Sequence, residues 1–93
     1  MRVLFSTGSP AGYMQPPLLS DEQVNCGPDW PDRREPDGRV LSLASPAGEY
    51  DLAALAATLP ADQQPEVVVC LVDASWRNLP RGLARFKCPR VLL

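Results

Sequence analysis

The residues best suited to chemistry lie in two loops, each directly after a short apolar run. The first loop follows Val3-Leu4-Phe5 and contains two glycines, and the second follows residues 67–72 and begins with Asp73. If the apolar runs are parallel strands, ligands are expected at their carboxyl ends, where both loops begin. The candidate substrate-binding residues are therefore Gly8, Ser9, Gly12, Tyr13, Asp73, Ser75, Arg77 and Asn78.

The glycine-containing loop lacks the features of the common nucleotide-binding motifs. A GxGxxG motif needs its second glycine where Pro10 stands, and proline has no backbone N–H to offer a pyrophosphate. No lysine follows the glycines, so a P-loop is excluded as well. The second apolar run ends at Leu43-Ala44-Ser45, where an NAD-binding fold would supply an acidic residue for the ribose. We predict a tight structural turn, with ligand contact as the alternative, and expect no cofactor.

Asp73 offers several kinds of chemistry at the end of the longest apolar run. Its carboxylate could be a phosphoacceptor, a metal ligand or a hydrogen-bond acceptor for substrate, but Asp-x-Ser before a helix is equally a capping arrangement. A receiver domain would also need an acidic pair after the first strand, and Ser6-Thr7 stands there. A degenerate receiver-like domain is therefore the weaker alternative.

The chain lacks the residues of the commonest catalytic systems. It has no histidine, which rules out Ser/His and Cys/His nucleophile pairs. Cys26, Cys70 and Cys88 have no CxxC spacing, so neither a zinc site nor a disulfide framework is indicated. Cys70 lies inside an apolar run and is predicted to be a core residue. The sequence assigns no catalytic residue and no metal ligand.

Composition places the chain among ordinary globular domains. Its 93 residues are 45% hydrophobic and 22% charged, with a net charge of -2. The late basic residues between Arg77 and Arg90 are spaced like the solvated face of a short helix, so no nucleic-acid partner is expected. The first apolar run is too short for a signal sequence or a membrane span. We predict a cytoplasmic protein without a membrane span.

Four apolar runs are predicted to form a short parallel sheet. Each gap between the second, third and fourth runs holds one predicted helix, as in βαβ units. The first helix is capped by Asp51 and extends to Leu59, and the second extends from Asn78 to Phe86. The sequence leaves two strand orders open, 3-2-1-4 and 2-1-3-4. The four runs are residues 3–5, 40–43, 67–72 and 91–93.

The connection between the first two runs is predicted to be irregular. Residues 14–38 read as a long proline-rich loop with one short helix, in which Ser20 and Gln23 form a capping box and Gly27 ends the helix. Trp30 is expected to anchor this loop to the body of the domain. Loops of this length are usually functional or disordered.

Several phrases of the sequence resemble a known family. These are Met1-Arg2-Val3-Leu4-Phe5-Ser6-Thr7 with its Gly/Ser/Pro turn, residues 51–60 ahead of 65–69, the phrase Leu79-Pro80-Arg81-Gly82-Leu83, and residues 88–93. Together they resemble the start of a bacterial glycosyltransferase of the GT-B type (glycosyltransferase group 1-like), and are most similar to spore-maturation CgeB-like proteins.

The resemblance implies a protein of two Rossmann-like domains. The N-terminal domain lines the acceptor side of a cleft, and the C-terminal domain binds most of the nucleotide-sugar donor. The whole of residues 1–93 would then be a Rossmann-like half-domain, with three α/β/α layers and a parallel sheet of about four strands. Such a fragment would be inactive alone and would meet nucleotide sugar and acceptor only within a longer protein.

A different class of function stays open beside the transferase. The chain would then be a small stand-alone Rossmann-like module that binds or interacts without catalysis. A monomer would favour this module, which would use its proline-rich loop and the edge of its last strand on a partner. If the sheet is incomplete, the uncovered edge of the last strand is instead expected to favour self-association.

Overall fold

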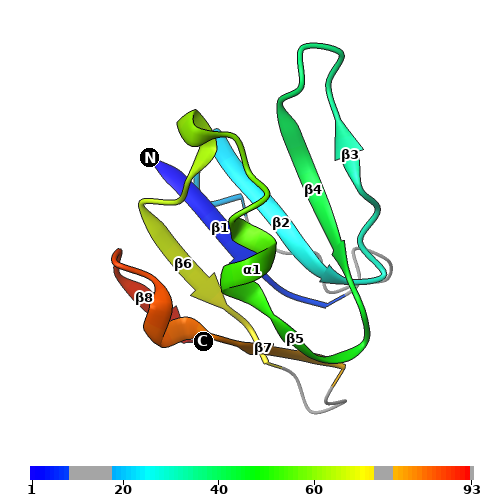
Figure 1. The fold of residues 1–93 in the computed structure, drawn as a ribbon, viewed down its shortest axis with the longest axis vertical. Coiled ribbons are helices and arrows are strands. Elements are labelled where there is room, and N and C mark those ends of the chain that lie inside the picture. Colours follow the sequence, from blue (N-terminus) through cyan, green and yellow to red (C-terminus); the bar gives the residue numbers. More distant parts are fainter. Residues whose placement is uncertain (9–17, 73–76, 93) are drawn as a thin grey trace.

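The computed structural model of the chain describes residues 1–8, 18–72 and 77–92. Its main feature is a six-stranded sheet in the order β3-β4-β2-β1-β6-β8, in which all neighbours except β3 and β4 run parallel (Figure 1). The strands are Arg2–Ser6 (β1), Glu22–Pro28 (β2), Arg33–Arg34 (β3), Val40–Ser45 (β4), Val67–Cys70 (β6) and Arg90–Leu92 (β8).

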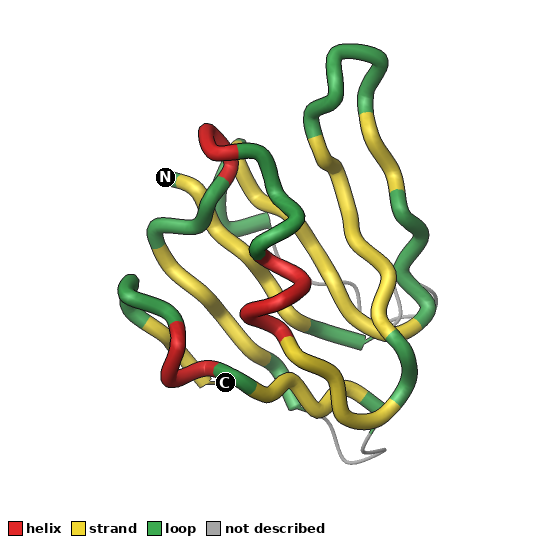
Figure 2. The backbone as a smooth tube through the Cα atoms, viewed as in Figure 1, coloured by secondary structure: helices red, strands yellow, loops and turns green. Residues whose placement is uncertain are grey.

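A small parallel sheet and three short helices complete the described structure. The sheet pairs β5 (Gly48–Asp51) with β7 (Asn78–Arg81), and the helices are α1 (Leu52–Ala56) and the 3₁₀ turns η1 (Ala61–Gln63) and η2 (Leu83–Arg85). Figure 2 shows how little of the backbone is helical. The predicted α/β class with a mostly parallel sheet is confirmed, but the described residues are helix-poor and form no clear three-layer sandwich.

All four apolar runs contribute strands, as predicted. They form β1, β4, β6 and β8, although β6 ends at Cys70 instead of Val72. In the sheet these four strands follow the order β4-β1-β6-β8, with β2 inserted between β4 and β1. If the four apolar runs are numbered along the chain, this order is 2-1-3-4, with the last run on the outer edge. The alternative 2-1-3-4 is therefore correct, and the order 3-2-1-4 is wrong.

The prediction of a loop with a short helix over residues 14–38 is wrong for the part that the structure describes. Glu22–Pro28 is β2, which pairs with β1 on one side and β4 on the other. Val24 and Cys26 are buried with the two-residue period of a strand. Pairing on both edges satisfies the backbone of this segment, which outweighs its local helical signals.

The residues predicted to cap a helix here make similar bonds at the entrance of β2. The Ser20 hydroxyl accepts a hydrogen bond from the Glu22 backbone N–H at 3.1 Å. The Gln23 side-chain oxygen accepts one from the Leu19 N–H at 2.7 Å. The side chains therefore satisfy backbone groups as predicted, but the chain that follows is extended.

The predicted helix from Asn78 to Phe86 is also wrong. Its first part is β7, followed by the single 3₁₀ turn η2. Gly82 separates the two in the left-handed conformation, with φ of 79°. A continuous α-helix cannot pass through such a residue, because right-handed helices need negative φ.

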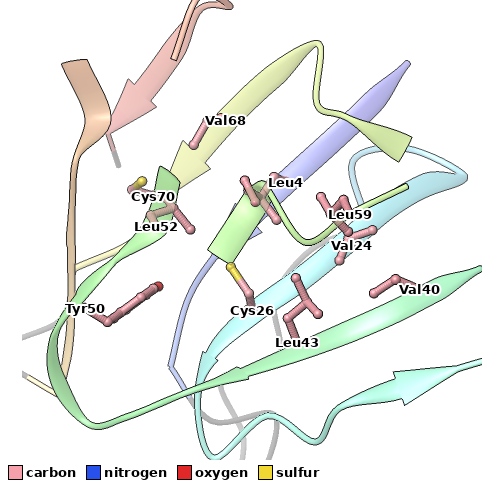
Figure 3. Packing of buried hydrophobic residues seen from close by; sticks show 11 residues of the cluster. Leu4, Val24, Cys26, Val40, Leu43, Tyr50, Leu52, Leu59, Val68 and Cys70 are labelled. Atoms are coloured by element: carbon pink, nitrogen blue, oxygen red, sulfur yellow. The ribbon is translucent and has the colours of Figure 1, made fainter. Parts of the chain in front are cut away.

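Helix α1 begins where predicted, with the Asp51 carboxylate accepting a hydrogen bond from the Ala54 N–H at 3.0 Å. It ends at Ala56, and hydrogen-bonded turns carry the chain to Leu59. Figure 3 shows the hydrophobic core that α1 shares with the sheet, in which Cys70 lies as predicted. The core residues are Leu4, Val24, Cys26, Val40, Leu43, Tyr50, Leu52, Ala56, Leu59, Val68 and Cys70.

A smaller cluster lies on strand positions that alternate with those of the main core. It consists of Val3 and Phe5 from β1 and Val69 from β6. All three side chains are buried, and Phe5 is completely so. β1 and β6 are therefore buried on both faces, as expected for parallel strands.

Candidate functional site

The direction of the strand order reverses between β1 and β6. From β1 the chain builds outward through β2 and β4, whereas β6 and β8 lie on the other side. Ser6 and Cys70 end these strands in register. Ligands of open parallel sheets bind beyond the carboxyl ends at such a switch point. We call this end of the sheet, where β1, β2 and β6 end, the carboxyl rim.

Two backbone hydrogen bonds join the strands just beyond their ends. The Thr7 N–H donates to the Cys26 carbonyl at 2.9 Å, and the Leu71 N–H donates to the Ser6 carbonyl at 2.8 Å. The starting points of both predicted site loops are therefore fixed side by side.

Three of the eight predicted site residues lie in the described structure. Gly8 and Arg77 lie at the carboxyl rim and contact the segment after β2: the Gly8 carbonyl accepts a hydrogen bond from Trp30 Nε1 at 2.7 Å, and the Arg77 guanidinium lies 2.6 Å from the Asp29 carboxylate. Asn78 is fully buried and faces inward. The other five, Ser9, Gly12, Tyr13, Asp73 and Ser75, lie outside the described residues.

The buried Asn78 belongs to a hydrogen-bonded network beneath the rim. Its side-chain oxygen accepts from the Tyr50 hydroxyl at 3.0 Å, and its amide nitrogen donates to the Ser6 hydroxyl at 3.1 Å and the Leu71 carbonyl at 2.9 Å. The Ser6 and Tyr50 hydroxyls are 2.5 Å apart. This network joins β5 and β7 to the ends of β1 and β6, so it holds the rim in place.

The network does not provide a nucleophile or a base. Burial raises the pKa of Cys26 from 9.0 to about 12 and that of Cys70 from 9.0 to about 11. Burial also raises the pKa of the Tyr50 hydroxyl, and the neighbouring Cys26 adds to the effect. These groups are neutral at physiological pH, so their role here is to position other residues.

Gly27 brings the end of β2 against the loop after β1. Its φ is 145°, and a Cβ at this position would lie 1.8 Å from the Thr7 carbonyl oxygen. Only glycine fits this close approach. Two residues later Asp29 adopts a left-handed conformation, with φ of 67°, which turns the chain toward Trp30 at the rim.

Sequence reasoning missed Asp29 as a site residue and foresaw only an anchoring role for Trp30. The indole does anchor this segment, as its hydrogen bond to Gly8 shows. From the sequence, the acidic residue of an NAD-binding fold is expected after the second apolar run, where Ser45 stands. The strand beside β1 is instead β2, and Asp29 follows it. The sequence signal that could have identified this strand, and Asp29 after it, was the alternation of Val24 and Cys26 ahead of the Gly-Pro-Asp turn.

The amino end of the sheet, opposite the carboxyl rim, carries a charged cavity of about 400 Å³. Its lining includes both acidic and basic side chains, and two of them are paired: Arg2 with Glu66, and Glu22 with the terminal amine of Met1. Such exposed pairs hold their groups in place only weakly. The cavity is lined by Arg2, Glu22, Asp37, Gly38, Arg39, Pro60, Asp62 and Gln63.

Neither a metal centre nor a membrane-spanning helix is found among residues 1–8, 18–72 and 77–92. No three His, Cys, Asp or Glu side chains in these ranges are grouped so that they could hold a metal ion. No helix there is long and apolar enough to cross a bilayer. The three cysteines are free.

The chain was also compared with models of known protein families, with curated proteins and with solved structures. None of the three comparisons finds a match.

Proposed function

We propose that this chain is the acceptor-side, N-terminal part of a GT-B type sugar transferase and is inactive by itself. The observation that carries the proposal is the order of the five parallel strands, β4-β2-β1-β6-β8. When β2 is counted with the four apolar runs and all five strands are numbered along the chain, the sheet reads 3-2-1-4-5. This is the order of the doubly wound Rossmann-like fold. The Rossmann-like assignment of residues 1–93 as a half-domain is part of the same proposal.

The chemistry of the carboxyl rim supports a binding role without catalysis. Its described polar side chains are Asp29, Arg77 and Trp30, which can contact a ligand, and its buried thiols and hydroxyls stay protonated. Group transfer would also need a nucleotide-sugar donor site, which the described residues of the carboxyl rim do not provide. A domain that provides only one wall of a cleft fits these properties.

Calorimetry with nucleotide sugars tests the proposal directly. Titration of the chain with UDP-glucose, GDP-mannose and dTDP-glucose should show no tight binding, because the donor-binding half is a separate domain in this scheme. Tight binding of any of these donors, or their hydrolysis by the chain alone, would overturn it.

The exposed edge of the sheet fits both the transferase fragment and the second candidate, a small interaction module that uses this edge on a partner. β8 is the last strand of the sheet, and Val91 and Leu92 on it are 43% and 67% exposed. An apolar edge strand of this kind recruits another strand. Light scattering after size exclusion should then show dimers that Val91→Lys converts to monomers; a monomeric wild-type chain would rule out self-association.

A further inference from the structure

We infer that Asp29 and Trp30 form a binding site for the vicinal diol of a sugar ring, at the carboxyl end of β2. This inference rests on the proposed function and deepens it, because it names the class of acceptor that the carboxyl rim would take. Neither residue belongs to the buried network of Ser6, Tyr50 and Asn78.

The position of Asp29 in the sheet is the first argument. β2 is the strand beside β1 on the side away from the switch point, and Asp29 is the first residue after it. In doubly wound folds a carboxylate at this place accepts hydrogen bonds from ribose hydroxyls. The left-handed backbone of Asp29 is an unusual conformation for a residue other than glycine, and such residues cluster at ligand sites.

The state of the carboxylate is the second argument. One oxygen, Oδ2, is held by Arg77 at 2.6 Å, and the side chains of both residues are 52% exposed. Within the described part of the chain, Oδ1 accepts no hydrogen bond. A diol can therefore donate to an oriented, accessible carboxylate, while the Arg77 guanidinium has further N–H groups to donate to a sugar oxygen.

The indole of Trp30 is the third argument. Its Nε1–H donates to the Gly8 carbonyl at 2.7 Å, which fixes the ring on the rim, and its side chain is only partly buried. The electron-rich face of a fixed indole suits the C–H groups of a sugar ring and loses little conformational entropy on binding. A carboxylate and a fixed aromatic ring on adjacent residues can provide the polar and the apolar contacts that a sugar needs.

The Trp30 indole N–H provides a direct reporter. In a Trp76→Phe variant Trp30 is the sole tryptophan, since the chain has two; position 76 lies outside the described residues. The indole resonance of this variant would be followed by NMR during titration with methyl mannoside, uridine or 2′-deoxyuridine. We expect a saturable shift with methyl mannoside at millimolar concentration and none with 2′-deoxyuridine, which lacks a vicinal diol on its ribose.

Matched variants assign the effect to the proposed contacts. Asp29→Asn should weaken binding about tenfold, the value of a charge-assisted hydrogen bond. Asp62→Asn removes the same charge at the amino end of the sheet and should leave the affinity unchanged. Trp30→Phe keeps an aromatic face and should retain part of the affinity; because it has no indole, its binding would be followed by the backbone amide shifts of Gly8 and Asp29. Equal loss in Asp29→Asn and Asp62→Asn would overturn the site.

The three ligands separate this inference from the proposed function. A shift with uridine but not with methyl mannoside supports the diol site and contradicts the acceptor-side assignment. If neither methyl mannoside nor uridine shifts the indole resonance, or if 2′-deoxyuridine shifts it equally, the diol site is overturned and the transferase proposal stands. Tight donor binding in calorimetry, well below the millimolar range expected of the diol site, overturns the transferase proposal whatever the indole does.

Discussion

The two ends of the parallel sheet are stabilised in different ways. At the carboxyl rim, small buried groups are fixed by several hydrogen bonds each, as in the network of Ser6, Tyr50 and Asn78. At the amino end, long exposed side chains surround a cavity of about 400 Å³ and pair across solvent. The charged cavity is thus lined largely by exposed charged side chains, whereas the carboxyl rim lies over a buried hydrogen-bonded network.

This difference teaches where a site is expected in such a fold. Buried hydrogen bonds and a glycine contact fix backbone positions, whereas exposed ion pairs contribute little and are weakened by salt. Precise binding needs a rigid support, so the carboxyl rim is the better candidate although the charged cavity lies elsewhere.

The largest difference between the two ends should appear at their glycines. Gly27→Ala should destabilise the protein by about 3 kcal/mol or more, because its Cβ would overlap the Thr7 carbonyl. Gly38→Ala, in the turn near the charged cavity, should cost only about 1–2 kcal/mol, because φ there is 94° but no atom lies within 4 Å. Urea denaturation measures both; equal costs would contradict a specific close contact at the carboxyl rim.

The next effect concerns the buried network. Asn78→Ala leaves polar partners without hydrogen bonds and should cost about 2–3 kcal/mol. Glu22→Ala removes an exposed ion pair at the amino end and should cost less than about 1 kcal/mol. A double-mutant cycle of Asn78→Ala with Tyr50→Phe should show coupling; strict additivity would mean that the network does not act as a unit.

The buried thiol at the carboxyl rim makes an alkaline pH dependence. Because the pKa of Cys26 rises from 9.0 to about 12 in the folded protein, the folded state holds its proton while the unfolded state releases it. The melting temperature should therefore be stable below pH 9 and fall as the pH rises from 9 toward 12. Cys26→Ala should flatten this decline; an unchanged slope would show that Cys26 is not buried as described.

The smallest effect is expected from the amino end at acidic pH. The backbone N–H and the charge of Arg2 lower the pKa of Glu66 below its ordinary 4.5, so this contribution is lost as the pH falls below that value. Glu66→Gln keeps an acceptor and should reduce the acid sensitivity only slightly. A large loss of stability in Glu66→Gln would show that the exposed end is better fixed than its contacts indicate.

The sequence predicted well those elements whose signal is apolar content. The Val- and Leu-rich runs became strands, and Asp51 caps α1, because burial and a local hydrogen bond decide these features. Both depend on residues adjacent in the chain, so they can be read without the rest of the fold.

The failures share one physical cause. β2 and β7 are polar at several positions and are held by partners distant in sequence: β2 by β1 and β4, and β7 by β5. The Ser20 and Gln23 side chains can accept backbone hydrogen bonds whether a helix or a strand follows, so this local signal does not distinguish the two. The proposed binding role of Asp29 and Trp30 could not be predicted for the same reason, because their place depends on β2 being a strand.

The most direct test of a binding site at the carboxyl rim is a map of amide shifts in the ¹⁵N-labelled chain during titration with methyl mannoside. We predict that shifts gather at Gly8, Asp29, Trp30 and Arg77 and that Arg2, Gly38 and Asp62 around the charged cavity stay unchanged. Shifts that gather around the charged cavity instead would contradict the assignment of the site to the carboxyl rim.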